Sequence, residues 1–320
     1  MAVIGLGLIG ASVALAIRRA RLHTIVVGVD VSRAVIGEAL ARRIVHEGSV
    51  DIAAVGAADL VLLAAPVLEN VALLGDVARH VSDRAVVTDV GSTKRAIVEA
   101  ARLAAPRMTF VGGHPIAGAA AKGLAAARPD LFAGRKWVFT PDGEVPDVTM
   151  ARLFAFASGL GAVPCAMTAD EHDRLLALAS HLPHLVVSAL MHIVGETGGE
   201  DALALAGAGL ADTTRIASSP PRIWKDILAT NSDNIRPALL RLIGVLSELA
   251  DANEDAEVLE RVFASACAWR QRAAAIWVSS SMPGTGSPAR VQARRRDQDP
   301  AATRSSPLSA DLVRGEGADL

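Results

Sequence analysis

The feature that most constrains the fold is an alternation, up to about Pro141, between short apolar runs and helical stretches. The runs are rich in Val, Ile and Leu, and they cover residues 2–5, 25–29, 60–64, 85–90, 109–113 and 137–140. The segments between them carry apolar residues at the three- and four-residue spacing of helices: 12–19, 33–42, 69–80 and 94–104. Apolar strands separated by helices form a parallel sheet that is covered on both faces. We therefore predict a doubly wound α/β domain over residues 1–143.

The composition changes after Pro141. Residues 163–167 are read as one further short strand, and residues 169–278 are nearly all helix-forming, with Ala, Leu and Arg dominating. We predict an all-α domain over residues 144–278, because long apolar helices of this kind usually bury one another and often a partner subunit. Residues 279–320 are rich in Ser, Pro, Gly and Arg, and we predict a disordered tail there.

Composition excludes several classes of protein. The 32 Lys and Arg residues are balanced by 34 Asp and Glu residues, so no basic surplus would attract nucleic acid. Cys165 and Cys267 form neither a disulfide framework nor a zinc spacing, which indicates a reducing, cytoplasmic location. Residues 175–194 are long and apolar enough to span a membrane. This stretch contains three histidines and Pro183, so we predict a buried helix and no membrane partner.

A glycine pattern directly follows the first strand and opens a helix: Gly5-Leu6-Gly7-Leu8-Ile9-Gly10. Gly5 permits a tight turn, Gly7 lets the backbone approach a pyrophosphate, and Gly10 lets helix and strand pack closely. The helix N-terminus, with the backbone of Leu8 and Ile9, offers free N–H groups and a positive dipole end to phosphates. Because the first strand begins at Met1 itself, we expect the natural start to lie slightly upstream.

An acid in register with these glycines strengthens the pattern. Asp30 ends the second strand, twenty residues after Gly10, where a carboxylate hydrogen-bonds the ribose hydroxyls. The combination predicts a Rossmann-type site for NAD, since Asp30 would repel the 2′-phosphate of NADP; Arg33 would soften that preference. The alternative is a glycine turn in an α/β protein that binds no dinucleotide.

Two clusters follow strands of the predicted sheet, where ligands of such folds bind. The segment 89–94 reads Asp-Val-Gly-Ser-Thr-Lys, and Ser92 in it could face a nicotinamide; the alternative is that Ser92 or Thr93 caps the next helix. The segment 112–118 reads Gly-Gly-His-Pro-Ile-Ala-Gly. His114 lies there between glycines and a proline beside the predicted cofactor, so we predict a general base.

A further group of polar residues lies in the helical half. His172-Asp173 precedes a Ser-His-Leu-Pro-His segment at 180–184, whose two histidines are spaced as metal ligands can be, although no third ligand is evident. Further on, Arg215 lies in an apolar stretch ahead of Trp224. An arginine in that setting is either a buried structural partner or a clamp for a substrate carboxylate, and the residues alone favour neither.

These motifs, in this order behind the glycine pattern, resemble the prephenate/arogenate dehydrogenase family of tyrosine biosynthesis over about residues 1–278. The resemblance implies an NAD-dependent oxidative decarboxylation: hydride leaves C4 of a cyclohexadienyl ring, CO2 departs from C1, and the ring becomes aromatic. It implies His114 as the base for the C4 hydroxyl and Ser92 as the residue that orients nicotinamide and hydroxyl. It also implies that the helical half is a dimerisation domain and that the enzyme is a homodimer.

The resemblance assigns the substrate pocket as well. Arg215 resembles the arginine that holds a carboxylate of the dicarboxylate substrate, and Ser180, His184 and Trp224 match positions that line the pocket. His172 and His181 match as structural partners. The chain departs from the family at residues 119–121, where three alanines replace a polar or acidic pair that helps to read the substrate side chain.

We expect prephenate as the substrate, with three alternatives within enzymes. Arogenate, or an aminated prephenate of a secondary pathway, would be handled by much the same sequence. A β-hydroxyacid dehydrogenase would need a lysine in the helical half, where the sequence has only Lys225. The alternative outside enzymes is a silent NAD sensor, which the presence of His114, Ser92 and Arg215 disfavours.

Overall fold

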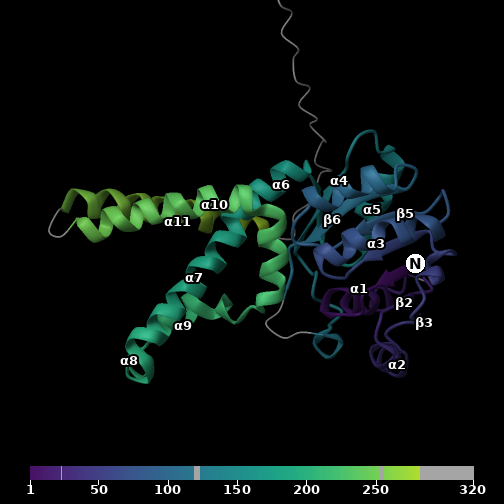
Figure 1. Ribbon diagram of the computed structural model, residues 1–320, viewed down its shortest axis with the longest axis horizontal. Coiled ribbons are helices and arrows are strands. Elements are labelled where there is room, and N and C mark those ends of the chain that lie inside the picture. The colour runs from purple at the N-terminus through teal and green to yellow at the C-terminus, as the bar shows by residue number, and fades with distance from the viewer. Residues whose placement is uncertain (23, 119–122, 253–255, 282–320) are drawn as a thin grey trace, which may run out of the picture. The chain divides into compact units, whose positions relative to one another are not determined.

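The computed structural model describes residues 1–22, 24–118, 123–252 and 256–281 (Figure 1). An α/β part forms the first half and a set of helices follows it, which confirms the predicted fold class. Of the tail predicted for residues 279–320, only the first three residues are described, and they end the last helix. The rest of that predicted tail lies outside the described residues.

Within the described residues the sheet has eight strands in the order β3-β2-β1-β4-β5-β6-β7-β8. The strands are β1 (Ala2–Ile4), β2 (Val27–Val29), β3 (Glu47–Ser49), β4 (Leu60–Leu63), β5 (Val86–Asp89), β6 (Thr109–Pro115), β7 (Lys136–Thr140) and β8 (Val163–Ala166). The helices of this half are α1 (Leu8–Arg19), α2 (Arg33–Ala41), α3 (Val67–His80), α4 (Arg95–Ala104) and α5 (Asp147–Gly159). The first six strands in this order, β3-β2-β1-β4-β5-β6, are all parallel. This order is typical of dinucleotide-binding sheets.

Both faces of the sheet are buried, as the apolar strands predict. Alternate residues of a strand point to opposite faces, so Val3 packs with α1, α2 and α5, whereas Ala2 and Ile4 pack with α3 and α4. Leu62 of β4 shares the first core, and its neighbours Val61 and Leu63 share the second. The two hydrophobic cores explain why these strands lack the polar alternation of a half-exposed sheet.

The far end of the sheet differs from the prediction. β7 runs antiparallel to β6, with His114 opposite Val138, and β8 then pairs parallel to β7. In the described part of the connection from β6 to β7, the only helical element is the single 3-10 turn Leu124–Ala126, and β7 returns along its neighbour. α5 and β8 follow residue 143, and β8 completes the sheet. The helices that carry no strand begin only at Ala169.

The predicted strands also omit β3. Its three residues, Glu47–Ser49, are polar or glycine and pair only with β2, at the edge of the sheet. An edge strand needs no apolar residues on both faces, so it leaves no hydrophobic signal in the sequence.

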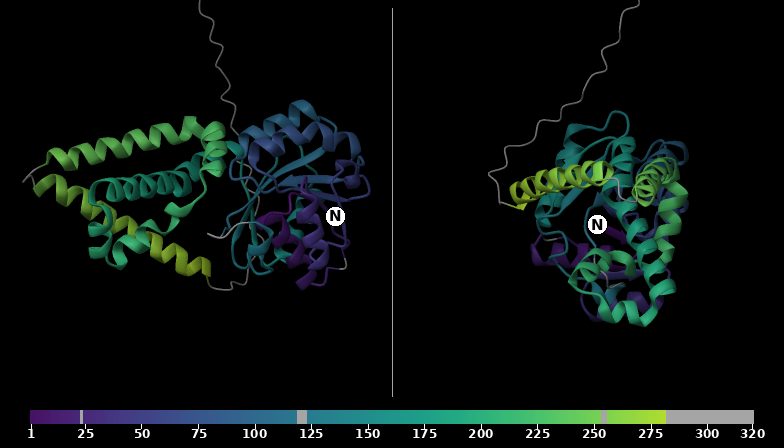
Figure 2. Two further views of the ribbon diagram at one scale, coloured as in Figure 1. Left: turned by 60° about the horizontal axis from the view of Figure 1, so that its bottom comes forward. Right: turned by 90° about the vertical axis from the view of Figure 1, so that its left-hand side faces the viewer.

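The second half contains the helices α6 (Ala169–Leu176), α7 (Leu182–Ile193), α8 (Gly199–Leu205), α9 (Ala208–Thr214), α10 (Pro221–Asp251) and α11 (Ala256–Ser281). Two π-helical turns, Ala177–His181 and Val194–Gly198, flank α7. α10 carries a non-helical residue, Asn231, with φ −142° and ψ 20°. Figure 2 shows that α11 diverges from α10 away from the connection between them. Several large apolar side chains on these two helices are therefore exposed: Leu240, Ile243, Leu246, Phe263 and Trp269.

The prediction of a buried helix over residues 175–194 is wrong within a single copy of the chain, where most of this stretch is not buried. The continuous helical stretch Ala169–Leu205 is long and apolar enough to cross a membrane by length and composition, and only 17% of its most apolar window is buried. Its N-terminal end is nevertheless anchored in the α/β half, where His172 and Asp173 are fully buried. Periodicity alone could not separate burial inside one chain from burial against a second molecule.

Candidate active site

Four parallel neighbours place the predicted site residues at one edge of the sheet. β1, β4, β5 and β6 run in the same direction, so their carboxyl ends meet at the same edge. The glycine turn follows β1, Ser92 follows β5, and His114 is the penultimate residue of β6. The order of the strands reverses between β1 and β4, which is where open α/β sheets bind dinucleotides.

The glycine turn has the shape that a pyrophosphate requires. Gly5 has φ +94°, and a Cβ there would lie 2.8 Å from the backbone of Ala64. A Cβ on Gly10 would lie 2.1 Å from the carbonyl oxygen of Gly5. Gly7, by contrast, has open space where a Cβ would stand. α1 begins at Leu8, so the first N–H groups of this helix, including those of Leu8 and Ile9, have no partner within the helix. The turn therefore fits a bound pyrophosphate.

Asp30 holds the turn from the second strand. Its Oδ2 accepts a hydrogen bond from the backbone N–H of Leu6 at 2.9 Å, and its Oδ1 accepts one from Ser32 at 2.9 Å. The carboxylate is only partly buried and retains lone pairs for ribose hydroxyls. Arg33 begins α2 and is exposed.

Replacing Asp30 with Asn is expected to weaken NAD+ and to relax the discrimination against NADP+. The variant keeps one oxygen for the turn but loses the negative charge, and a hydrogen bond to a charged group contributes about 1.5–3 kcal/mol. The KM for NAD+ should rise by about tenfold or more, while the KM for NADP+ should fall. Steady-state kinetics with both cofactors checks this; an unchanged ratio of kcat/KM would show that Asp30 does not read the ribose.

A buried ion pair holds the backbone just before His114. Lys94 and Asp89 are fully buried and form a salt bridge. Asp89 Oδ1 accepts a hydrogen bond from the N–H of Gly113 at 2.9 Å, and Lys94 Nζ donates one to the carbonyl oxygen of Gly113 at 2.8 Å. Burial lowers the pKa of Lys94, and Asp89 opposes that shift. The sequence motif contained both residues, but nothing in their spacing indicated that they fix Gly113.

Neither residue that the sequence offers as a cap for α4 performs that task. The Thr93 hydroxyl lies 2.7 Å from the hydroxyl of Thr230, and Ser92 is partly exposed, with no hydrogen bond from its hydroxyl to another described residue. The cap comes from a distant helix instead: the carboxylate of Asp173 accepts the N–H groups of Lys94 at 2.8 Å and Arg95 at 3.0 Å. The Ser92 hydroxyl thus stays available for a ligand.

His114 is held on one side only. Its Nδ1 lies 2.8 Å from Nε2 of His172, and Nδ1 of His172 lies 2.7 Å from Oδ1 of Asp173. His114 is partly buried, and its Nε2 makes no hydrogen bond to another described residue. Burial lowers the pKa of His114 well below the ordinary histidine value of 6.5, and repulsion from the cationic forms of His172, Lys94 and His181 acts in the same direction. The imidazole is therefore neutral at neutral pH, as a base must be.

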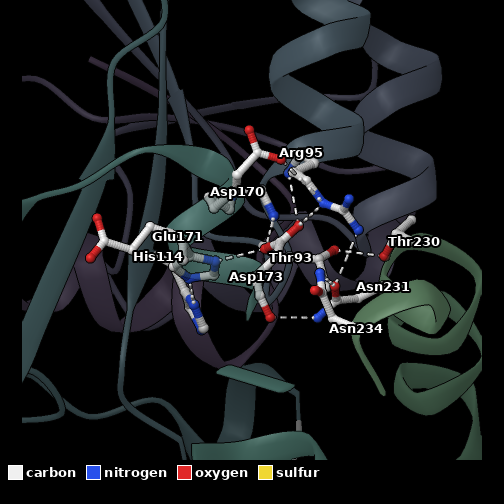
Figure 3. A network of polar contacts seen from close by, with 12 residues as sticks. Thr93, Arg95, His114, Asp170, Glu171, Asp173, Thr230, Asn231 and Asn234 are labelled. Carbon is white, nitrogen blue, oxygen red and sulfur yellow. Dashed lines mark hydrogen bonds and ion pairs between the residues drawn. The ribbon is translucent and has the colours of Figure 1, made fainter. Parts of the chain in front are cut away.

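A polar network surrounds Asp173 and joins α4, α6 and α10 (Figure 3). Asn231 donates from Nδ2 to the carbonyl oxygen of Asp173 at 2.9 Å, at the point where α10 departs from helical geometry. The same Nδ2 lies 3.2 Å from Nδ1 of His181. Arg95 lies 3.5 Å from Asp173 through Nε and forms an ion pair with Asp233. Sequence reasoning missed Arg95 and Asn231, because no local pattern marks a contact between segments so far apart in the chain.

The aromatic residue of the predicted pocket packs against both histidines of the 180–184 segment. The Trp224 ring centroid lies 6.1 Å from that of His181 and 4.9 Å from that of His184. His184 Nδ1 donates to the carbonyl oxygen of Ser180 at 3.0 Å, which leaves the Nε2 lone pair free when the ring is neutral. Ser180, His184 and Trp224 therefore lie close together, beside a π-helical turn of the kind often found at functional sites.

His181 is expected to make the fold sensitive to acid. It is fully buried, and burial lowers its pKa from 6.5 to about 4. Between these pH values the unfolded chain binds a proton that the folded chain does not, so the free energy of unfolding should fall by about 3 kcal/mol as the pH drops. Urea titrations at about pH 7 and about pH 4.5 measure this. His181→Asn, which keeps an acceptor for Asn231 but cannot titrate, should show a smaller loss; an equal loss in both proteins would contradict the assignment.

Arg215 is exposed at the end of α9, and its guanidinium forms no ion pair with another described residue. Arg215 is therefore not buried within this chain, and a free guanidinium suits a carboxylate ligand. The alanines at 119–121 lie outside the described residues. Among the residues that are described, no group of three or more His, Cys, Asp and Glu could hold a metal.

A dinucleotide turn, an acid on the second strand and a neutral histidine at the same sheet edge define the class of NAD-dependent oxidoreductases. Family models described as prephenate dehydrogenase match this chain: the nucleotide-binding domain over residues 13–165 and the dimerization domain over residues 168–265. The chain belongs to the prephenate dehydrogenase family.

Individual relatives agree with the family models. The prephenate dehydrogenase of Bacillus subtilis is 34% identical over 273 residues, which are 83% of this chain and 74% of the relative. The structure of Aquifex aeolicus prephenate dehydrogenase in complex with hydroxyphenyl propionate and NAD+ is 29% identical, with a TM-score of 0.77 over 84% of this chain and 96% of that one. Synechocystis arogenate dehydrogenase is 30% identical, with a TM-score of 0.71 over 85% and 98% of the two chains.

Proposed function

We propose that this protein catalyses the NAD-dependent oxidative decarboxylation of prephenate to 4-hydroxyphenylpyruvate. The observation that carries the proposal is the setting of His114: a neutral imidazole at the carboxyl edge of the sheet, beside the glycine turn, with Nε2 unoccupied by another described residue. Membership of the prephenate dehydrogenase family supports the substrate class. When bound, NAD+ supplies the acceptor for the hydride.

The residues of this chain then have distinct tasks. The glycine turn and the first N–H groups of α1 hold the pyrophosphate, and Asp30 holds the ribose. His114 Nε2 takes the proton of the C4 hydroxyl as hydride leaves the ring, and the Ser92 hydroxyl orients that hydroxyl. Arg215 holds a carboxylate of the substrate through its free guanidinium. Aromatisation of the ring supplies much of the driving force, so the protein contributes mainly positioning and one base.

Arogenate is the second candidate, because the arogenate dehydrogenase of Synechocystis is similar to this chain over 85% of its length. The two substrates differ only in a pyruvyl or an alanyl side chain. Purified protein with NAD+ and either acid, followed by NADH absorbance, distinguishes them. Turnover of prephenate alone supports the proposal, and turnover of arogenate alone would transfer the same mechanism to the other substrate. If the protein binds NAD+ but turns over neither acid, aminated prephenate is the next substrate to test. Failure with that substrate too would favour an NAD sensor without catalytic activity.

We further propose a cytoplasmic homodimer. The exposed apolar side chains of α10 and α11, together with the largely exposed stretch Ala169–Leu205, give a surface that a second copy would cover. Most of this surface lies in residues 168–265, which match the dimerization domain. Cys165 and Cys267 are both free, which suits a reducing compartment.

A further inference from the structure

The donors and acceptors around His114 fix a direction of hydrogen bonding. The carboxylate of Asp173 can only accept hydrogen bonds, so Nδ1 of His172 donates to it. In the neutral form of His172, Nε2 carries a lone pair, and this nitrogen can only accept from Nδ1 of His114. A neutral His114 with its proton on Nδ1 carries a lone pair on Nε2. With His172 in this form, the direction of the whole series is set at its buried end, by Asp173.

Asp173 is suited to set that direction because it is held as an anion on all sides. Its carboxylate accepts the two N–H groups at the start of α4, from Lys94 and Arg95, in addition to His172. A helix N-terminus stabilises negative charge, and the Arg95 guanidinium adds a cation at 3.5 Å. Asn231 fixes the backbone of the same residue.

We propose that His172 and Asp173 are positioning residues for the reaction: they hold His114 as the tautomer with its proton on Nδ1 and thereby present Nε2 as the base. The proposal rests on the proposed function, in which His114 is that base. We call the three residues His114, His172 and Asp173 the triad. The same logic operates in serine hydrolases, where a buried aspartate sets the tautomer of the catalytic histidine. In this chain a second imidazole lies between the two.

Two variants of His172 separate positioning from simple packing. His172→Phe keeps a planar ring of similar size but offers no acceptor to His114, and we expect kcat to fall by about 10²-fold or more while KM for both substrates stays within about threefold. His172→Gln can place its amide oxygen near the former Nε2 and should recover at least about tenfold of that loss. Thr168→Ala is the matched control, because it removes the hydrogen bond from Glu171 N–H that caps the same helix and leaves the triad intact. Its kcat should stay within about twofold of the wild type.

Nitrogen-15 NMR of histidine-labelled protein reads the tautomer without any substrate. The resonances of His114 are assigned by their absence in His114→Asn, and at neutral pH they should show a protonated Nδ1 and an unprotonated Nε2. In His172→Phe the two tautomers should mix. Wild-type kcat in His172→Phe, a comparable loss in Thr168→Ala, or a protonated Nε2 in the wild type would each overturn the proposal. If the wild type turns over no cyclohexadienyl acid, the proposed function fails, and the NMR result still decides whether the triad sets the tautomer.

Discussion

Replacing His114 with Asn is expected to lower kcat by about 10²- to 10⁴-fold, the usual contribution of a general base. The amide cannot take the proton of the C4 hydroxyl, so the hydride would have to leave while that proton is still in place. The KM for NAD+ should change little, because the glycine turn and Asp30 lie on other strands. NADH formation under saturating substrates measures the effect. His80→Asn, at an exposed histidine of α3, is the matched control and should keep wild-type activity.

The pH profile gives an independent test of the same assignment. The base works when it is neutral, and burial together with His172, Lys94 and His181 lowers the pKa of His114 well below 6.5. In the logarithm of kcat/KM we therefore expect a plateau through neutral pH and an acid limb only well below pH 6.5. An acid limb at or above the ordinary histidine value would show that another group is the base.

The second large effect is expected from Lys94. Replacing it with Met leaves the carboxylate of Asp89 buried without its cation, and breaking a buried ion pair in this way costs about 3–5 kcal/mol of folding stability. The segment before His114 also loses the hydrogen bond that Lys94 donates to Gly113. Urea unfolding followed by circular dichroism measures the loss. Lys136→Met, at an exposed lysine that begins β7, should lie within about 0.5 kcal/mol of the wild type.

A double variant shows whether the unpaired charge is the cause. Asp89→Asn combined with Lys94→Met removes both charges, so it should recover part of the stability that Lys94→Met loses. Asp89 accepts the N–H groups of Gly91 and Gly113 with its two different oxygens, and the single oxygen of the Asn side chain can keep one of these bonds. A double variant less stable than Lys94→Met would mean that the carboxylate matters chiefly for these backbone bonds.

Local signals explain how much of the fold the sequence could predict. The strands β1, β4 and β5 are buried on both faces, and their continuous apolar runs locate them directly. The glycine turn is equally easy to find, because its three glycines lie within six residues, although the contact that excludes a Cβ at Gly5 comes from Ala64, far along the chain. The antiparallel direction of β7 has no such signal, because it depends on how the chain connects β6 to β7 rather than on the residues of the strand.

The candidate site shows the same division. His114, Ser92 and Arg215 lie in local sequence motifs, so the sequence could indicate them. The contact between Asn231 and Asp173 joins residues that are 58 positions apart, and no local motif marks it. The cap of α4 is a clear case: two hydroxyl residues stand where a cap is expected, yet a carboxylate from α6 takes their place. Tertiary contacts of this kind override local preference, and only the folded chain reveals them.

The remote cap of α4 has a consequence for how the protein is made. The ribosome delivers the whole sheet, through β8, before α6 with Asp173 emerges. Until then the first N–H groups of α4 have no carboxylate, and nothing from the helical half steadies the loop that carries Ser92. We therefore expect a nascent chain that ends at β8 to form its sheet, while the start of α4 and the loop that carries Ser92 stay unfolded. These segments should become ordered only after the helices of the second half have been synthesised and have folded.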